Sequence, residues 1–108
     1  MDDIIKTAEI FTFNAKVDYS SNGIVSKKII QKPTGNLSLF AFDAGQELSE
    51  HSAPFDAVVQ VLEGEAEIII NHEPYNVKAG ETIIMPANKP HAVIARKKFK
   101  MLLTMIKE

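Results

Sequence analysis

Turn-forming residues interrupt the apolar stretches of this chain at regular intervals, so that every apolar stretch is short. Gly, Pro, Asn or Asp occurs in each of the segments 33–36, 43–45, 63–64, 71–74, 78–80 and 86–90. Turns spaced by roughly 8–12 residues are typical of a β-sandwich or β-barrel. The chain also lacks the apolar periodicity of a long amphipathic helix. The sequence therefore predicts an all-β fold.

The runs between these turns are rich in Val, Ile and Phe, which favour β-strands. Eight strands are predicted, at Ile24–Gln31, Leu37–Phe42, Ala57–Leu62, Glu65–Asn71, Tyr75–Val77, Thr82–Met85, His91–Ala95 and Phe99–Ile106. Glu63–Gly64 and segment 71–74 are predicted to be tight reversals, so that consecutive strands pair antiparallel in a small closed barrel. Met1–Ile10 is predicted to be an extended arm, or one helical turn capped by Asp2 or Asp3.

Composition excludes several classes of protein. A chain of 108 residues forms one core and has no room for a second module. The net charge is -2 and the lysines are dispersed, so no basic stripe is available for nucleic acid. No apolar stretch approaches the ~20 residues of a membrane span and no leader pattern is present, so a cytoplasmic protein is expected. Cysteine is absent, which excludes disulfides, thiolate ligands and a cysteine nucleophile.

The run Ala57–Leu62 is apolar on both sides of the predicted strand. Ala57, Val59 and Val61 share one face, while Val58 and Leu62 share the other. Both faces must be covered, and the barrel interior covers only one of them. A second subunit is the preferred cover for the other face, which predicts a homodimer. The alternative is that the N-terminal arm of the same chain covers it.

Two spaced motifs follow each other along the chain. The first is Gly45, His51, Ala53, Ala57 and Gly64, with five, one, three and six residues in the intervals. The second is Gly80, Pro86, Ala87, Asn88 and His91, with five residues after the glycine and two before the histidine. In order and spacing they resemble the two motifs of the cupin superfamily. The resemblance implies a small double-stranded β-helix, or jelly-roll barrel, as a single domain with an arm at 1–23 and a barrel at 24–108.

The resemblance also implies where a metal ion would bind. In metal-binding cupins the first motif supplies two histidines and a glutamate, and the second motif supplies a histidine. The corresponding positions here are His51, Ala53, Ala57 and His91. Only His51 and His91 can coordinate, so any divalent transition metal would be held weakly, since stable sites generally have three or more protein ligands. No other cofactor is implied. Asn88 replaces a family glycine, which is tolerated because Asn adopts positive φ easily.

Other residues near the motifs are either replacement ligands or residues without a role at the site. Strand alternation places Gln60 on the outer face, whereas a bulge near Pro54 would turn Asp56 inward. His72 lies in a predicted turn and is expected to have no special role. Glu65 and Glu67 alternate with apolar residues and are expected to point outward. Met85, Met101 and Met105 either line a cavity or simply fill the core.

The preferred functional hypothesis is a barrel cavity that binds a small polar or anionic molecule. The predicted cavity residues are His51, Ala53, Ala57, Val59, Met85 and His91. The alternative is a metal-dependent enzyme, a dioxygenase or an isomerase, with an ion at His51 and His91, or a metal-free catalyst with one histidine as base. The two histidines are equally well explained as hydrogen-bonding groups of a polar pocket. The sequence leaves open whether the protein is an enzyme.

Overall fold

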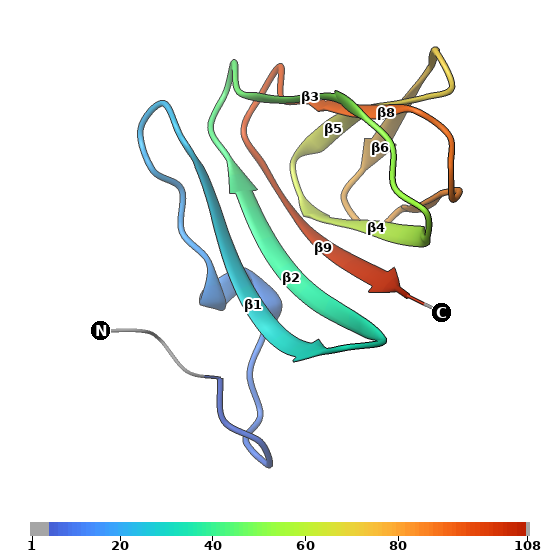
Figure 1. Cartoon of the computed structure of the whole chain (residues 1–108). Coiled ribbons are helices and arrows are strands. Elements are labelled where there is room, and N and C mark those ends of the chain that lie inside the picture. The colour runs from blue at the N-terminus through green and yellow to red at the C-terminus, as the bar shows by residue number, and fades with distance from the viewer. Residues whose placement is uncertain (1–4, 108) are drawn as a thin grey trace.

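Residues 5–107, which the computed structural model describes, form two antiparallel β-sheets and one short helix. The five-stranded sheet has the order β1 (Ile24–Lys32), β2 (Gly35–Phe42), β9 (Phe99–Ile106), β4 (Asp56–Glu63) and β7 (Thr82–Met85). The four-stranded sheet has the order β3 (Glu47–His51), β8 (His91–Ile94), β5 (Glu65–Ile70) and β6 (Glu73–Lys78). The sheets pack face to face, with the 3₁₀ helix η1 (Phe13–Lys16) against the five-stranded one (Figure 1). The predicted all-β class is confirmed.

Each of the eight predicted strands is present, with both ends within two residues of the prediction. The sequence missed β3, because Leu48 is the only large apolar residue of that mostly exposed edge strand. The proposed helical turn falls partly on residues 1–4, which lie outside the described residues. Within the described part of the arm, the helix lies at Phe13–Lys16 instead.

The prediction that Glu63–Gly64 forms a hairpin between paired strands was wrong. β4 pairs with β7 and β9, whereas β5 pairs with β6 and β8, so the turn carries the chain from one sheet to the other. Gly64 has φ 77°, and a Cβ there would collide with the carbonyl oxygen of Lys98. The second predicted reversal is confirmed: Asn71 and His72, both at positive φ, join β5 to β6 in a two-residue hairpin.

The main core lies between the two sheets. The Phe42 and Phe99 rings stack with centroids 4.6 Å apart, and Val59, Ile68 and Met101 are almost completely buried around them. Close packing of this kind leaves the strand ends, rather than the middle of the barrel, as the accessible part of the interior.

A second, smaller cluster covers part of the outer face of the five-stranded sheet. Val17, from the segment that follows η1, packs with Leu39 and Leu102, and Leu62 packs against the same cluster. The Tyr19 hydroxyl donates a 2.6 Å hydrogen bond to Glu63. The N-terminal segment of the chain therefore covers this part of the face. This is the alternative that the sequence offered to a second subunit. Between residues 5 and 107, no helix has the length and apolarity needed to cross a bilayer.

Candidate ligand and metal site

Two histidines from neighbouring strands face each other. β3 ends at His51 and β8 begins at His91, and the two residues are register partners. Their Nε2 atoms lie 3.1 Å apart, and the rings meet edge to face with centroids 4.4 Å apart. His91 is buried, whereas His51 is exposed. The pair can therefore be approached from the side of β3.

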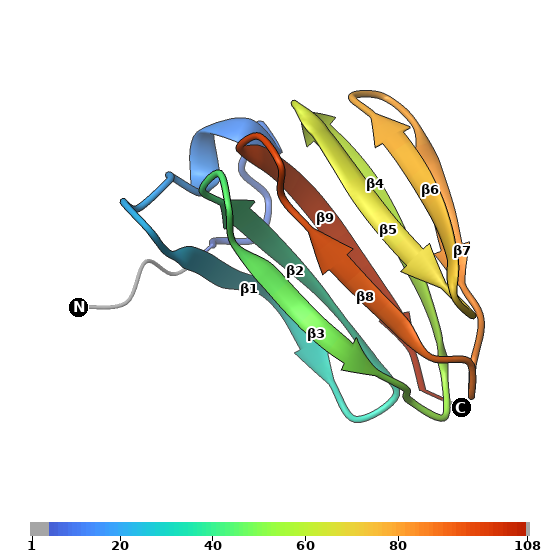
Figure 2. The same ribbon diagram turned by 90° about the horizontal axis from the view of Figure 1, so that it is seen from above.

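The histidine pair lies at the end of the molecule where β3, β5 and β7 finish and where β4 and β8 begin (Figure 2). Two loops border this end, residues 52–55 between β3 and β4 and residues 86–90 between β7 and β8. Pro86 and Pro90 restrict the backbone of the second loop, which leads directly into His91. The strand ends and these loops form the rim of the barrel.

Hydrogen bonds tie the two loops together. The Ala87 N–H donates to Asp56 Oδ1 at 2.8 Å, and the Asn88 N–H donates to the Ala53 carbonyl at 2.7 Å. Asn88 has φ 66°, which agrees with the expectation that it replaces a glycine at positive φ. Asp56 is exposed and holds the loop before His91, so it does not stand in for a missing ligand.

The carbonyl of Ser49 determines which nitrogen of His51 carries a proton. His51 Nδ1 lies 2.9 Å from this oxygen. Because a carbonyl only accepts hydrogen bonds, Nδ1 must donate, and a neutral His51 then presents the lone pair of its Nε2 to His91. A hydrogen bond between the two Nε2 atoms of a neutral pair then requires His91 to donate its Nε2 proton to His51. Such a bond would place one proton between the two rings.

Burial favours the uncharged form of His91. Its Nδ1 is buried, and no hydrogen bond to it from the described part of the chain is present. Desolvation lowers the pKa of His91, and the neighbouring His51 lowers it further. A backbone contact with Lys89 raises this pKa by a smaller amount. A negative group beside the rings would oppose both of the lowering effects.

The predicted cavity residues differ in how far they are accessible. Ala57, Val59 and Met85 are only 5%, 0% and 4% exposed and belong to the main core. Ala57 has Met85 and Met105 as its cross-strand neighbours. Ala53 is half-buried and lies in the loop that follows His51. The structure thus brings the two histidines together at the rim. Ala57 lies in the core, next to Met85 and Met105.

The donor set falls short of a complete metal site. The 3.1 Å separation of the two Nε2 atoms suits two ligands of one ion, each at about 2.0–2.1 Å from it. The Nδ1 contact of His51 with a carbonyl is also typical of a coordinating imidazole. Among the described residues, however, no group of three or more His, Asp, Glu or Cys side chains could hold an ion. Two protein ligands are available at this pair.

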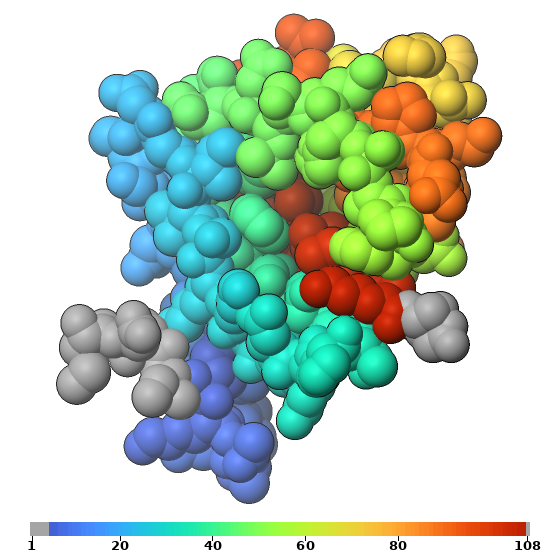
Figure 3. Space-filling model, viewed as in Figure 1, coloured from blue at the N-terminus to red at the C-terminus, as the bar shows by residue number. Residues whose placement is uncertain are grey.

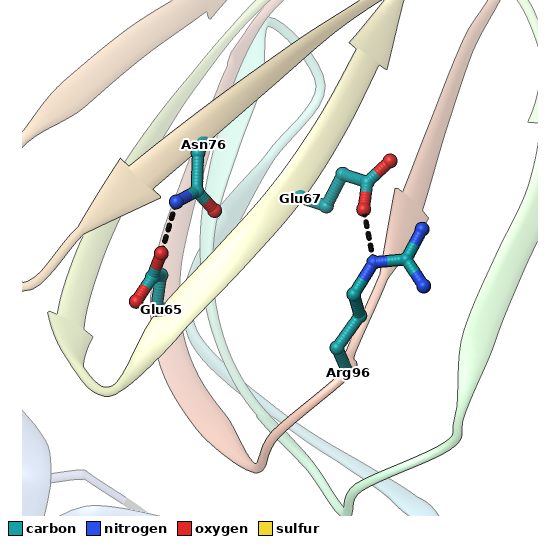
Figure 4. A network of polar contacts seen from close by, with 4 residues as sticks. All are labelled: Glu65, Glu67, Asn76 and Arg96. Carbon is teal, nitrogen blue, oxygen red and sulfur yellow. Dashed lines mark hydrogen bonds and ion pairs between the residues drawn. The ribbon is translucent and has the colours of Figure 1, made fainter.

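Several residues weighed from the sequence lie away from the pair. Gln60 is exposed on the outer face, as expected. The His72 side chain is 73% exposed and lies 3.6 Å from Glu50, which fits the expectation of no special role. Glu65 bonds with Asn76, and Glu67 pairs with Arg96 at 2.5 Å, on the four-stranded sheet (Figure 4). These two glutamates are half-buried rather than fully solvated, because each has a polar partner.

Two buried polar residues of β2 were not recognised from the sequence. Asn36 and Ser38 are each 7% exposed, and they share with Phe40 and Phe42 the face of β2 that meets the other sheet. Among residues 5–107, Asn36 Oδ1 has no hydrogen-bond partner, and Asn36 lies next to Met105 in the register. The signal was present, because the two polar residues stand at every second position before two inward-facing phenylalanines.

Comparison with known proteins agrees with this architecture. A conserved protein of unknown function from Streptococcus pyogenes is 38% identical, with a TM-score of 0.92, over 98% of this chain and 93% of that chain. A cupin 2 conserved barrel domain protein from Leptotrichia buccalis is 41% identical, with a TM-score of 0.87, over 90% of this chain and 47% of that one. This chain thus spans about half of the Leptotrichia protein.

A more distant likeness shows the shared fold alone. Salicylate 1,2-dioxygenase from Pseudoaminobacter salicylatoxidans is 18% identical, with a TM-score of 0.73, over 86% of this chain and 27% of that chain. A search of curated proteins found no match. The family model described as a cupin domain matches residues 38–107, which include both spaced motifs from Gly45 to His91. The chain is a member of the cupin domain family, with a jelly-roll barrel of cupin type.

Proposed function

We propose that the protein binds a small polar or anionic molecule at the rim of the barrel, against His51 and His91, and that binding rather than catalysis is its main role. The observation that carries this proposal is the 3.1 Å contact between the two Nε2 atoms. A neutral pair joined by an Nε2–H···Nε2 hydrogen bond shares one proton and can take up one more. A cytoplasmic location remains part of the proposal.

The chemistry of the pair favours an anion. A second proton would make the pair cationic, which burial of His91 and repulsion between the rings oppose in the free protein. An anion beside the exposed His51 ring offsets both costs, because opposite charges attract strongly in a partly desolvated site. Binding should therefore take up a proton, and affinity should rise as the pH falls.

A metal-dependent enzyme is the second candidate. The spacing of the two Nε2 atoms and the carbonyl partner of His51 Nδ1 favour it. The donor set opposes it, because Ala53 and Ala57 provide methyl groups where cupins of known metal content have ligands. An ion held by two histidines would leave most of its coordination to exchangeable water or to a bound anion. No reaction step is assigned to it.

The test is an NMR titration of the imidazole signals with small anions. Inorganic phosphate, oxalate, citrate and benzoate serve as probes, at pH 6.5. At least one should shift the His51 and His91 signals in a saturable manner and leave the His72 signals unchanged. The His91→Gln variant should lose at least ten-fold in affinity, whereas the His72→Gln control should bind as the unaltered protein does.

Two results would count against this function. If none of the four anions shifts the histidine pair, the proposed anion site is absent. If zinc or manganese at one equivalent survives dialysis, and is lost in the His91→Gln variant only, the metal-dependent candidate is favoured instead.

A further inference from the structure

The inner face of the five-stranded sheet carries a polar residue at the rim. Ile106, the last residue of β9, is the register partner of Asp56, the first residue of β4, so the end of β9 belongs to the rim. Asn36 and Met105 form the next pair along β2 and β9. Figure 3 shows the end of β9, in red, at the surface between the β1–β2 hairpin and the start of β4. Asn36 therefore lies at the same end of the barrel as the histidine pair.

The space between the sheets is open beside Asn36. Leu103 and Met105 point between the two sheets and pack against the main core, yet both are only half-buried. Phe40, which shares the inner face of β2 with Asn36, is half-buried as well. Ala57 of β4, in the same register row as Met105, is buried. The accessible part of the interior thus lies along β2 and β9.

The strands that carry the histidines face this open part. Leu48 of β3 packs in the same core cluster as Phe40 of β2. Val93 of β8 belongs to that cluster together with Met101 of β9. β3 and β8 therefore lie across the core from β2 and β9 (Figure 2). Since stacked sheets are about 10 Å apart, one small molecule can touch the histidine pair on one side and Asn36 on the other.

Asn36 has a polar group that lacks a partner. The residue is 7% exposed, and its Oδ1 accepts no hydrogen bond from any of residues 5–107. An unpaired buried oxygen destabilises a fold, and native proteins retain few of them. Ser38, which is also 7% exposed, continues the polar character along the same face. We call Asn36 and Ser38 the polar strip of β2.

We propose that the polar strip of β2 is the second half of the binding site at the histidine pair, and that the ligand is a small carboxylic acid with a hydroxyl group on an apolar body. The carboxylate binds His51 and His91, and the hydroxyl group bonds with Asn36. Because a hydroxyl group both donates and accepts hydrogen bonds, it matches either end of the amide. Leu103 and the adaptable Met105 contact the apolar body. This inference rests on the proposed function, since it names the ligand class of the same site.

The surroundings of Asn36 favour an uncharged group at the second end of the ligand. Its register partners are Gln31 on β1 and Met105 on β9, and neither carries a charge. A second carboxylate beside them would lose its hydration without gaining a cationic neighbour in the register, which is strongly unfavourable. A hydroxyl group costs much less to desolvate and regains its hydrogen bonds. The site should therefore prefer a hydroxy acid to a dicarboxylic acid.

NMR titrations with matched acids test the inference on the unaltered protein. Cyclohexanecarboxylate is the reference, and the cis and trans isomers of 4-hydroxycyclohexanecarboxylate add a hydroxyl group to the same rigid ring. At pH 6.5, at least one hydroxy isomer should bind at the His51 and His91 signals about five-fold more tightly than the reference, as expected for one added hydrogen bond. 4-Methylcyclohexanecarboxylate, which has the size without the hydroxyl group, should show no such gain. The trans-1,4-dicarboxylate should bind more weakly than the preferred hydroxy isomer.

An apolar replacement of similar size tests the role of Asn36. Asn36→Leu should abolish the preference for the hydroxy isomer and leave the affinity for cyclohexanecarboxylate within about two-fold. Without ligand, this variant should be at least as stable as the unaltered protein in thermal denaturation, because an unpaired buried polar group is removed. Asn76→Leu is the matched control, since Asn76 is exposed on β6, and it should keep the preference.

Failure of this inference is distinguishable from failure of the proposed function. If neither these five acids nor the four anions above shift the histidine signals, the proposed function fails, and this inference fails with it. If cyclohexanecarboxylate binds but neither hydroxy isomer is preferred to it, the anion site stands and the ligand class is overturned. A dicarboxylate that binds as tightly as the hydroxy acid, or an Asn36→Leu variant that keeps the preference, would also overturn it.

Discussion

His51 and His91 are register partners on two antiparallel strands, and their Nε2 atoms lie 3.1 Å apart. Forty positions of sequence separate them, and their contact forms only when β3 and β8 pair in this register. The Ser49 carbonyl contacts one ring, and burial lowers the pKa of the other. The proposed binding function depends on this contact more than on any other feature of the rim.

The lowered pKa of His91 predicts how stability depends on pH. The folded protein disfavours the protonated form of this ring, whereas the unfolded chain takes up the proton near pH 6.5. The stabilising contribution is therefore fully present above that pH and is lost as the pH falls below it. Urea denaturation at pH 8.0 and pH 5.5 should show this loss for the unaltered protein. The loss should be smaller in His91→Gln, and His72→Gln should behave as the unaltered protein. An unchanged pH dependence in His91→Gln would contradict the assignment.

The bond between Asp56 and the Ala87 N–H predicts a positioning role for Asp56. Asp56→Ala removes the acceptor of a 2.8 Å hydrogen bond and should cost about 1 kcal/mol of stability. Amide exchange at Ala87 and Asn88 should become faster, and anion binding at the histidine pair should weaken. Gln60→Ala is the control, since Gln60 is exposed on the same strand and has no such bond to the loop. Unchanged exchange at Ala87 would show that the loop is held by other contacts.

Gly64 predicts a large effect of one added methyl group. Gly64→Ala combines positive φ with a collision against the Lys98 carbonyl and should destabilise the protein by roughly 3 kcal/mol. Gly45→Ala is the matched control, because Gly45 has φ 88° with open space around it, and it should cost only about 1 kcal/mol. Thermal denaturation of both variants measures the difference. Equal losses would mean that conformational strain alone, and not the close approach of the backbone, requires this glycine.

The strands were predictable because the residues within each strand carry the signal for β-structure. Runs such as Phe99–Ile106 contain enough β-branched and aromatic residues to be recognised without long-range knowledge. β3 was not recognised, because Glu47–His51 is a polar edge strand held mainly by its pairing with β8. Gly64 correctly indicated positive φ, but a glycine turn does not reveal whether the next strand stays in the same sheet.

The site was predictable only in part. Spacing within the two motifs placed His51 and His91 at the rim, and the structure brings them into contact. The bond of Asp56 to the loop and the burial of Asn36 depend on contacts between segments that are distant in sequence. The charge state of the pair depends on burial and on the Ser49 carbonyl, which no local pattern encodes.

Restoring the missing ligands should create a metal site. Ala53→His combined with Ala57→Glu adds two donors beside the histidine pair and should raise zinc or manganese affinity at least 100-fold. Ala57 packs next to Met85 and Met105, so some loss of stability is expected. Ala53→His combined with Gln60→Glu is the control, because Gln60 lies on the outer face. No gain in affinity by the first variant, with its circular dichroism preserved, would show that these alanines do not face the histidines.

Nitrogen-15 chemical shifts of the imidazole rings test the shared proton most directly. At pH 8, His51 should be the Nδ1–H tautomer and His91 the Nε2–H tautomer. In His51→Ala the pKa of His91 should rise, because one of the two causes that lower it is removed. An Nε2–H tautomer at His51, or an Nδ1–H tautomer at His91, would contradict the account.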